Sequence, residues 1–449
     1  LALRRGNEAA AGRELQALAR ATGKDADEGW RHAFGVLLGG GKDSKATTRL
    51  LTTLLDSGAI PNRLQAWLAF GGLAQRLDQD ALAERIVSEV VRRFPGEPRV
   101  ALLHVSQLRE SGQREQARKA LDGLLGRADS DAELRLAIAA EYEALGDFPA
   151  AAAVLARGPQ DAQSYALRAS MLARAKDTPT LQRLYDELRR DSARPDPERR
   201  LLLGQVAEFL ELHEQALTWY RSVPGGEQRV QAQLREASVL HTLKRRDEAY
   251  VQVRQLQDDA AADQESRRDA YALEAELRLR DKDAAAELDA YARGLAAFPD
   301  DPGLLYARAL VWERRDDIAR AEADLRKILV AQPDSVTALN ALGYTLADRT
   351  TRYAEALELI ARARTADPDS AAIIDSYGWV LYRLGRSQEA IVELRRAYAL
   401  QKDAEIAAHL GEVLWRAGER VEARKFFEEA RALDPDSRAL QRALANTGQ

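Results

Sequence analysis

Residues 375–390 read DSYGWVLYRLGRSQEA, and the spacing of their small residues decides the fold. Gly385 lies between Gly378 and Ala390, and glycine readily adopts the left-handed conformation that ends many helices. The stretch therefore predicts two helices joined by a turn at Gly385. A small residue on each helix, Gly378 on the first and Ala390 on the second, would let the two backbones approach closely.

The same unit recurs along the second half of the chain. FPDD, QPDS, DPDS, QKDA and DPDS mark the ends of successive units at Pro299, Pro333, Pro368, Lys402 and Pro435, with spacings of 34, 35, 34 and 33 residues. Small residues precede these marks in matching pairs: Ala309 and Ala321, Gly343 and Ala356, Gly378 and Ala390, Gly411 and Ala423. A period of about 34 residues with paired helices is typical of tetratricopeptide repeats.

The sequence therefore predicts an all-α fold, a tetratricopeptide-repeat solenoid wound as a right-handed superhelix of about 11–12 helix-turn-helix repeats. We expect four segments. Residues 1–62 hold N-terminal helices and a divergent first repeat, and residues 63–300 form an array that is degenerate over 163–300. Residues 301–436 form high-fidelity repeats, and residues 437–449 a capping helix and tail. A cap is expected because each repeat buries its apolar face only against its neighbours.

Composition argues against several classes of protein. Lys and Arg number 66 against 71 Asp and Glu, so the net charge of −5 argues against a protein that neutralises nucleic-acid phosphates. The absence of cysteine excludes disulfides and thiolate chemistry. The longest stretch of small apolar residues, AAAAVLA at 150–156, is far shorter than the roughly 18 residues of a membrane span.

No motif in the sequence carries catalytic chemistry. LHEQAL at 212–217 begins like a zinc-protease helix, but Leu217 replaces the second histidine ligand. The five histidines are scattered, and no nucleophile elbow or dinucleotide-binding glycine pattern occurs. We therefore predict that the protein is not an enzyme and that it has no cofactor, catalytic residues or metal site.

The aromatic residues of the last repeats are the candidate binding site. In the repeat register Tyr377 and Leu381 face the second helix, whereas Asp375, Trp379 and Tyr382 share another face of the first helix. In tetratricopeptide arrays that face lines the concave groove. The neighbouring repeats place further residues on it, so the predicted protein-binding groove consists of Asn340, Tyr344, Asp375, Trp379, Tyr382, Glu412 and Trp415.

Two interpretations of these rings are open. Aromatic anchors among polar groups are typical of protein-binding surfaces. Alternatively, tight curvature of the superhelix buries some of the rings against an adjacent repeat. The residue types also bear on the partner: arrays that bind chaperone C-terminal carboxylates use Lys and Asn here, whereas this chain has Asp375 and aromatic rings, which disfavours such a tail.

Three segments carry a family resemblance: ALNALGYTLADRTTRYAEALELI at 338–360, DSAAIIDSYGWVLYRLGRSQEA at 369–390 and EIAAHLGEVLWRAGERVEARKFFEEA at 405–430. They resemble the LbcA-type tetratricopeptide lipoproteins of gram-negative envelopes, which are adaptors of the carboxyl-terminal processing protease CtpA. The resemblance is specific only from Ala338 onward, and the earlier residues match as generic repeats.

The resemblance implies a periplasmic scaffold anchored to the outer membrane as a lipoprotein. Its expected partners are a CtpA-like carboxyl-terminal processing protease and, as substrates, peptidoglycan cross-link hydrolases, with no nucleic acid. The lipid anchor would lie on a cysteine that this sequence does not contain. The alternative is a repeat scaffold in exopolysaccharide export or another envelope assembly, which would bind a porin or synthase component and no protease.

Overall fold

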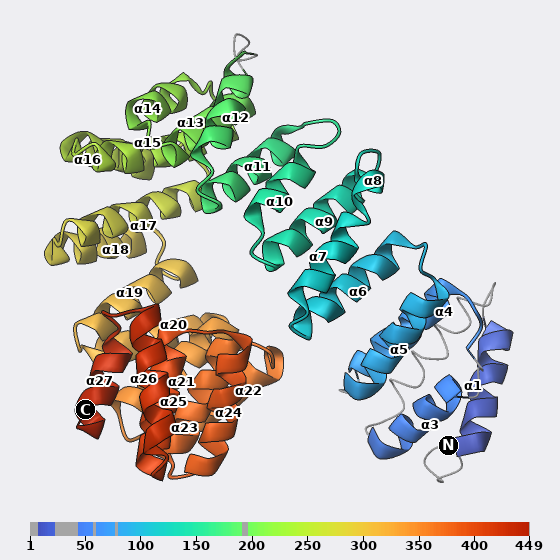
Figure 1. Cartoon of the computed structure of the whole chain (residues 1–449). Helices are drawn as coiled ribbons and strands as arrows, with labels where there is room; N and C mark the ends of the chain where they lie inside the picture. Colours follow the sequence, from blue (N-terminus) through green and yellow to red (C-terminus); the bar gives the residue numbers. More distant parts are fainter. Residues whose placement is uncertain (1–7, 23–43, 57–59, 77–79, 191–195, 449) are drawn as a thin grey trace. The chain divides into compact units, whose positions relative to one another are not determined.

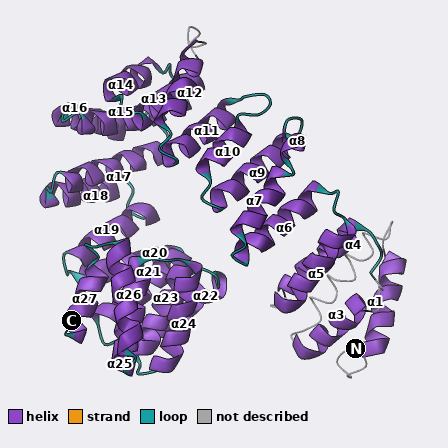
Figure 2. Ribbon diagram, in the orientation of Figure 1, coloured by secondary structure: helices purple, strands orange, loops and turns teal. Residues whose placement is uncertain are grey.

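In the computed structural model, all regular structure of the described residues is helical (Figure 2). The structure describes residues 8–22, 44–56, 60–76, 80–190 and 196–448, which form 26 helices and no strands. No helix in these ranges is long and apolar enough to cross a bilayer. The prediction of an all-α tetratricopeptide fold is confirmed.

The chain divides into two compact units, Leu1–Gln228 and Arg229–Gln449 (Figure 1). The helices of the first unit are α1 (Glu8–Thr22), α3 (Ser44–Asp56), α4 (Leu64–Arg76), α5 (Asp80–Arg93), α6 (Pro98–Glu110), α7 (Arg114–Asp122), α8 (Leu125–Ala128), α9 (Ala132–Ala144), α10 (Phe148–Leu155), α11 (Ala162–Arg174), α12 (Thr178–Arg190), α13 (Pro197–Phe209) and α14 (His213–Ser222).

The second unit begins in the first turn of α15 and contains the high-fidelity repeats. Its helices are α15 (Glu227–Thr242), α16 (Arg246–Asp258), α17 (Gln264–Arg280), α18 (Ala284–Ala297), α19 (Pro302–Arg314), α20 (Ile318–Ala331), α21 (Val336–Arg349), α22 (Tyr353–Ala366), α23 (Ala371–Arg383), α24 (Ser387–Leu400), α25 (Ala404–Ala417), α26 (Arg420–Leu433) and α27 (Arg438–Thr447).

Between α4 and α26 ten pairs of helices in the described residues pack as repeats: α4–α5, α6–α7, α9–α10, α11–α12, α13–α14, α17–α18, α19–α20, α21–α22, α23–α24 and α25–α26. The short helix α8 is an addition, and α27 follows as the predicted cap. The boundaries of the four segments stay a prediction. Part of the first segment, 1–62, lies outside the described residues. The handedness of the superhelix also stays a prediction.

Close packing through small residues is confirmed in the high-fidelity repeats. A Cβ on Gly378 would lie 2.8 Å from Cγ of Leu394, and one on Gly411 would lie 2.5 Å from the Phe427 ring. Their partners Ala390 and Ala423 are fully buried. Because a Cβ at either glycine would overlap its neighbour, only glycine lets the paired helices approach so closely.

The turn between paired helices explains why the middle of the chain reads as degenerate. One residue in most of these turns has a left-handed backbone conformation, and it is glycine at Gly146, Gly385 and Gly418. Other residue types occupy the same place elsewhere, at Lys176, Glu211, Lys244, Lys282 and Asp316. The repeat geometry therefore persists over 163–300 where its glycine signal is lost.

Polar contacts mark where repeats begin and where they join. Many first and second helices start with an aspartate whose carboxylate accepts a backbone N–H in the first turn, as Asp301 does from Leu304. Lys327, Arg362 and Arg396 each donate to the carbonyl of the proline that ends the preceding repeat, at Pro299, Pro333 and Pro368 respectively.

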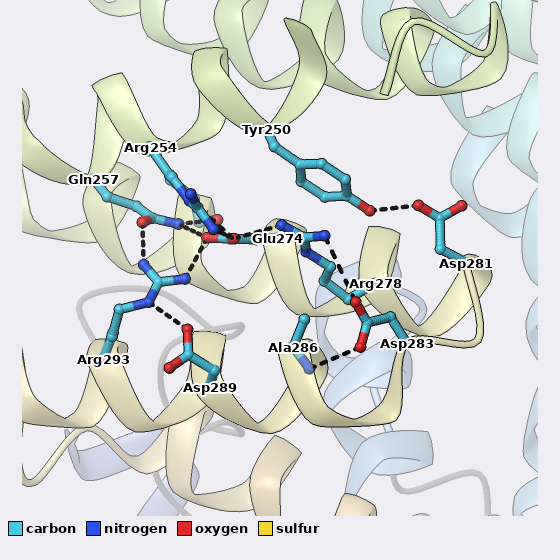
Figure 3. Close-up of polar contacts among 11 residues, drawn as sticks. Tyr250, Arg254, Gln257, Glu274, Arg278, Asp281, Asp283, Ala286, Asp289 and Arg293 are labelled. Carbon is cyan, nitrogen blue, oxygen red and sulfur yellow. Dashed lines mark hydrogen bonds and ion pairs between the residues drawn. The ribbon is translucent and has the colours of Figure 1, made fainter. Parts of the chain in front are cut away.

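A buried carboxylate joins α16, α17 and α18 (Figure 3). Glu274 on α17 is almost fully buried and pairs with Arg254, Arg278 and Arg293, and it also accepts from Gln257. Burial raises the pKa of Glu274, but its arginine and glutamine partners outweigh burial and hold that pKa below its usual range. This cluster is a structural link between two repeats, because its carboxylate is fully engaged.

Candidate functional site

Three consecutive first helices, α21, α23 and α25, bring part of the predicted groove together. Asp375 on α23 accepts from Nδ1 of His409 on α25 at 2.9 Å. The other ring nitrogen of His409 lies 3.3 Å from the hydroxyl of Tyr344 on α21, and that hydroxyl donates to Glu405 at 2.7 Å. Hydrogen bonds thus run from Asp375 through His409 and Tyr344 to Glu405, and they join three repeats.

The His409 imidazole carries a positive charge in this arrangement. Burial lowers the pKa of His409, but the carboxylate of Asp375 outweighs burial and raises that pKa to about 9. The ring stacks on Trp379 with centroids 4.2 Å apart and planes 23° apart. An imidazolium on an indole face is a favourable cation–π contact. His409 therefore fixes both Asp375 and Trp379.

Trp379 belongs to the inner packing of the second unit. Only 4% of its surface is exposed, and its Nε1 has no hydrogen-bond partner. Its other aromatic neighbour is Tyr382, with centroids 5.2 Å apart. Asp375 and Glu412 are buried as well. For Trp379 the structure agrees with the packing interpretation, while the role of these residues in binding stays a prediction.

Tyr382 is the half-buried ring at the edge of this cluster. Its hydroxyl donates to Glu412 at 3.4 Å, and Glu412 also accepts from Asn446 on α27. Burial raises the pKa of Glu412 above its ordinary value. Tyr382 therefore combines partial exposure of its ring with a place beside Trp379, as Tyr344 does beside His409.

Asn340 and Trp415 lie at the margins of the cluster. Asn340 on α21 lines a cavity together with Tyr344 and Asp375, and its side-chain oxygen is buried without a hydrogen-bond partner. Trp415, at the end of α25, lies against Arg420 and Arg424 of α26. The structure thus brings Tyr344, Asp375, Trp379, Tyr382 and Glu412 together and leaves the other two predicted residues at its margins.

Three cavities open along these first helices. A cavity of about 340 Å³ lies between α19, α21 and the start of α25, and Asn340, Tyr344 and Glu405 line it. A second, of about 510 Å³, lies between α27 and the Trp379 cluster. The third, of about 1130 Å³, lies between α19, the start of α25 and α27. Cavities of this size can receive side chains of a polypeptide partner.

The potential in the first cavity is negative. Glu313, Asp375, Asp403 and Glu405 line it, and none of its lining residues is Lys or Arg. The carboxylate of Glu313 forms no hydrogen bond or ion pair with any described residue, and burial raises its pKa. A partner that enters here must therefore supply hydrogen-bond donors or positive charge.

Sequence reasoning missed His409 as a site residue, although the repeat period points to it. In the repeat register, which sets Gly411 against Gly378, His409 lies one residue past the equivalent of Asp375, so the spacing brings the two residues close together on neighbouring first helices. The ion pair of Arg442 on α27 with Asp348 on α21 had no such signal, because α27 has no counterpart in the repeat.

This arrangement suits recognition of a polypeptide. Among the residues that the structure describes, no group of three or more His, Asp or Glu side chains could hold a metal ion. What the inner wall offers is a half-buried tyrosine, carboxylates and cavities. These are features of a protein-binding surface.

Comparison with known proteins agrees with the repeat fold. The tetratricopeptide repeat family matches residues 306–371 and 378–438. The chain is 43% identical over 211 residues to the TPR repeat-containing protein PA4667 of Pseudomonas aeruginosa. That match covers 47% of this chain and 35% of the relative, so it spans about a third of the relative's length.

Solved structures with similar repeats share little sequence with this chain. TTC0263, a thermophilic repeat protein of Thermus thermophilus, aligns with 39% of this chain and 96% of its own, at 22% identity and a TM-score of 0.34. PilW, a type IV pilus biogenesis factor, aligns with 49% of this chain and 100% of its own, at 16% identity and a TM-score of 0.38. From its helix pairs and its matched repeats, the chain has the tetratricopeptide-repeat fold, a helical scaffold for protein interaction.

Proposed function

We propose that the chain is a non-enzymatic adaptor that binds a carboxyl-terminal processing protease and its peptidoglycan-hydrolase substrates. It would act in the periplasm, held to the outer membrane by a lipid anchor outside this sequence. The concave face of the last repeats, formed by α19, α21, α23, α25 and α27, is the proposed binding surface.

The observation that carries the proposal is the inner wall of these repeats. It combines the half-buried Tyr382 with three adjoining cavities that carboxylates line. Hot spots of protein interfaces are commonly aromatic side chains ringed by polar groups. The wall therefore offers both an aromatic anchor and pockets for side chains of a partner.

The choice of partner is supported by sequence. The segments that resemble the protease adaptors, 338–360, 369–390 and 405–430, include all seven predicted groove residues together with His409 and Glu405. Asp375 is among them, so the hydrogen bonds that shape the wall lie within the segments that carry the resemblance.

The mechanism would be one of effective concentration. A scaffold that binds enzyme and substrate together makes their encounter intramolecular, and effective concentrations of about millimolar are common for short linkages. The scaffold would thus accelerate cleavage without chemistry of its own. A long array has room for two partners, and the last repeats would hold one of them.

The test is a reconstituted cleavage reaction. A purified carboxyl-terminal processing protease is mixed with a peptidoglycan cross-link hydrolase, with and without the 449-residue chain, and loss of the hydrolase is followed over time. We expect the chain to have no activity alone and to accelerate cleavage. In the Tyr382→Ala variant the acceleration should fall about tenfold, as for loss of one hot-spot ring.

The matched control is Val392→Ala, because Val392 on α24 is 67% exposed and lines none of the three cavities. It should accelerate cleavage as the wild type does. Failure of the wild-type chain to accelerate cleavage, together with recovery of export components and no protease from envelope extracts, would favour the exopolysaccharide alternative.

A further inference from the structure

The last helix reaches back over the concave face of earlier repeats. Arg442 on α27 pairs with Asp348 on α21, which precedes it by 94 residues. Asn446 donates to Glu412 on α25, and the backbone carbonyl of Asn446 accepts from Arg416. A helix that only continued the stack would contact its immediate neighbours, whereas α27 also bonds to α21, which lies nearly three repeats earlier in the chain.

The apolar contact that holds α27 is small. Its buried residues are Ala439, Leu440 and Ala443, and it packs chiefly against α25. Two of these three side chains are single methyl groups, which contribute much less burial than leucine or isoleucine. The Arg442 side chain of the ion pair is 43% exposed, so that pair contributes modestly.

The space around α27 is only partly filled. Ala439 and Arg442 line both the cavity of about 510 Å³ and the cavity of about 1130 Å³, so α27 separates the two. Ala445 faces the larger one. Longer apolar side chains at Ala439 and Ala445 would extend into cavities that these methyl groups leave open.

Charge on the wall matches charge on the helix. Carboxylates outnumber cations on the wall of the larger cavity, where six acidic residues, Glu313, Asp316, Asp403, Glu405, Asp434 and Asp436, face three basic ones, Arg314, Arg349 and Lys402. In the smaller cavity Asp348 and Glu412 lie beside Arg349, Arg383 and His409, so the excess of negative charge belongs to the larger cavity. The sequence of α27, RALQRALANT, contains two arginines and no acidic residue. Complementary charge of this kind selects partners and orients them.

We propose that α27 is a displaceable ligand of the chain's own groove. The partner segment that replaces it is a basic amphipathic helix, with an arginine in the place of Arg442 and larger apolar side chains in the places of Ala439 and Ala445. This inference rests on the proposed function in taking the concave face of the last repeats as the partner site. It adds the class of ligand and the means of regulation.

The first test measures opening of α27 in the full chain by hydrogen exchange. The amides of α27 should exchange at least about 100-fold faster than those of α25, because a locally opening segment is less protected than the core. The Arg442→Glu variant should speed exchange of α27 about tenfold further, since it replaces an ion pair with like charges near Asp348.

The matched control is Arg431→Glu, which makes the same charge change on α26, at an exposed residue that lines none of the three cavities and forms no ion pair within the described part of the chain. It should change exchange of α27 by less than about threefold. Equal protection of α27 and α25 in the wild type would show a permanent cap and overturn the proposal.

The second test uses a fluorescein-labelled peptide of residues 436–449 that carries Ala439→Leu and Ala445→Leu, with fluorescence anisotropy as the readout. It should bind the wild-type chain about tenfold more tightly than the unsubstituted peptide does, as expected for two filled methylene-sized voids. A peptide that also carries Arg442→Glu should not bind.

The two tests are linked quantitatively. If the groove binds the peptide only when α27 is displaced, the Arg442→Glu chain must bind the peptide more tightly than the wild type does. The factor must equal the factor by which hydrogen exchange of α27 increases in that variant. Absence of saturable binding to both chains would overturn the inference. Binding of the peptide, with no acceleration of cleavage in the reconstituted reaction, would uphold the helix site while the adaptor function fails.

Discussion

The Asp375→Asn substitution tests the electrostatic link among the last repeats. It removes the charge that faces His409 and keeps the size of the side chain. In the wild type the carboxylate accepts from Nδ1 of His409 at 2.9 Å, and both side chains are buried. Without the carboxylate, burial disfavours the charged imidazole, so the ring becomes neutral at pH 7.

The magnitude follows from the pKa of His409. The folded value of about 9 compares with an ordinary value of 6.5. One pKa unit corresponds to about 1.4 kcal/mol, so charged His409 contributes roughly 3 kcal/mol to the folded state. Removal of one partner from a buried ion pair typically costs about 3–5 kcal/mol, which agrees.

The sign of the pH dependence is fixed by the direction of this shift. Because the folded pKa is raised, the stabilisation is complete below pH 6.5 and is lost as the pH rises through about 9. The opening free energy of α23 and α25 in the wild type should therefore fall across this window. Asp375→Asn should lower that free energy by roughly 3 kcal/mol below pH 6.5 and remove the decline.

The assay is native-state hydrogen exchange of α23 and α25, corrected for the intrinsic pH dependence of exchange. The control is Asp369→Asn, which removes an equal charge from an exposed ion pair with Arg396 and should cost less than about 0.5 kcal/mol. A loss under about 1 kcal/mol in Asp375→Asn, or an unchanged pH dependence, would refute the assignment of a charged His409.

Three further variants test the packing of the repeats. Gly378→Ala places a Cβ 2.8 Å from Leu394 and should destabilise the second unit by about 1–3 kcal/mol in thermal unfolding. By contrast, a Cβ at Gly72 would have no neighbouring atom within 4 Å, so Gly72→Ala should stabilise the first unit by about 0.5–1 kcal/mol. Lys244→Gly relieves a left-handed lysine in the α15–α16 turn and should raise the unfolding free energy by about 0.5–1 kcal/mol; a lower melting temperature would contradict this. Glu274→Gln should cost about 3 kcal/mol above pH 4.5, where the carboxylate is charged in both states, and less as the pH falls through its lowered pKa. Equal effects of Glu274→Gln and of exposed Glu276→Gln on urea unfolding would show that the buried cluster is not stabilising.

The repeat fold could be predicted because its signal is steric. Gly378 and Ala390 mark a contact that excludes larger side chains, and that constraint recurs with the repeat. Where the turn uses Lys176, Glu211 or Lys244 in place of glycine, the geometry is kept by the packing of the helices. The pattern then disappears from the sequence although the structure repeats.

The sequence predicts which face of α23 carries Trp379, but it does not predict that the ring is buried. Register places Trp379 on the inner side of its helix, and it does not tell what covers the ring. The cover is His409 of the next repeat, and its charge comes from Asp375. The Arg442–Asp348 pair lay beyond prediction because α27 stands outside the repeat.

The concave face of the last repeats, as the proposed partner site, can be probed with a photo-crosslinking amino acid placed at Tyr382 on the inner face and, in a second variant, at Val392 on the outer face. Each variant is irradiated with the purified protease and hydrolase. We expect cross-links to one of these partners from the position of Tyr382 and none from that of Val392. Cross-links from Val392 alone would contradict this expectation.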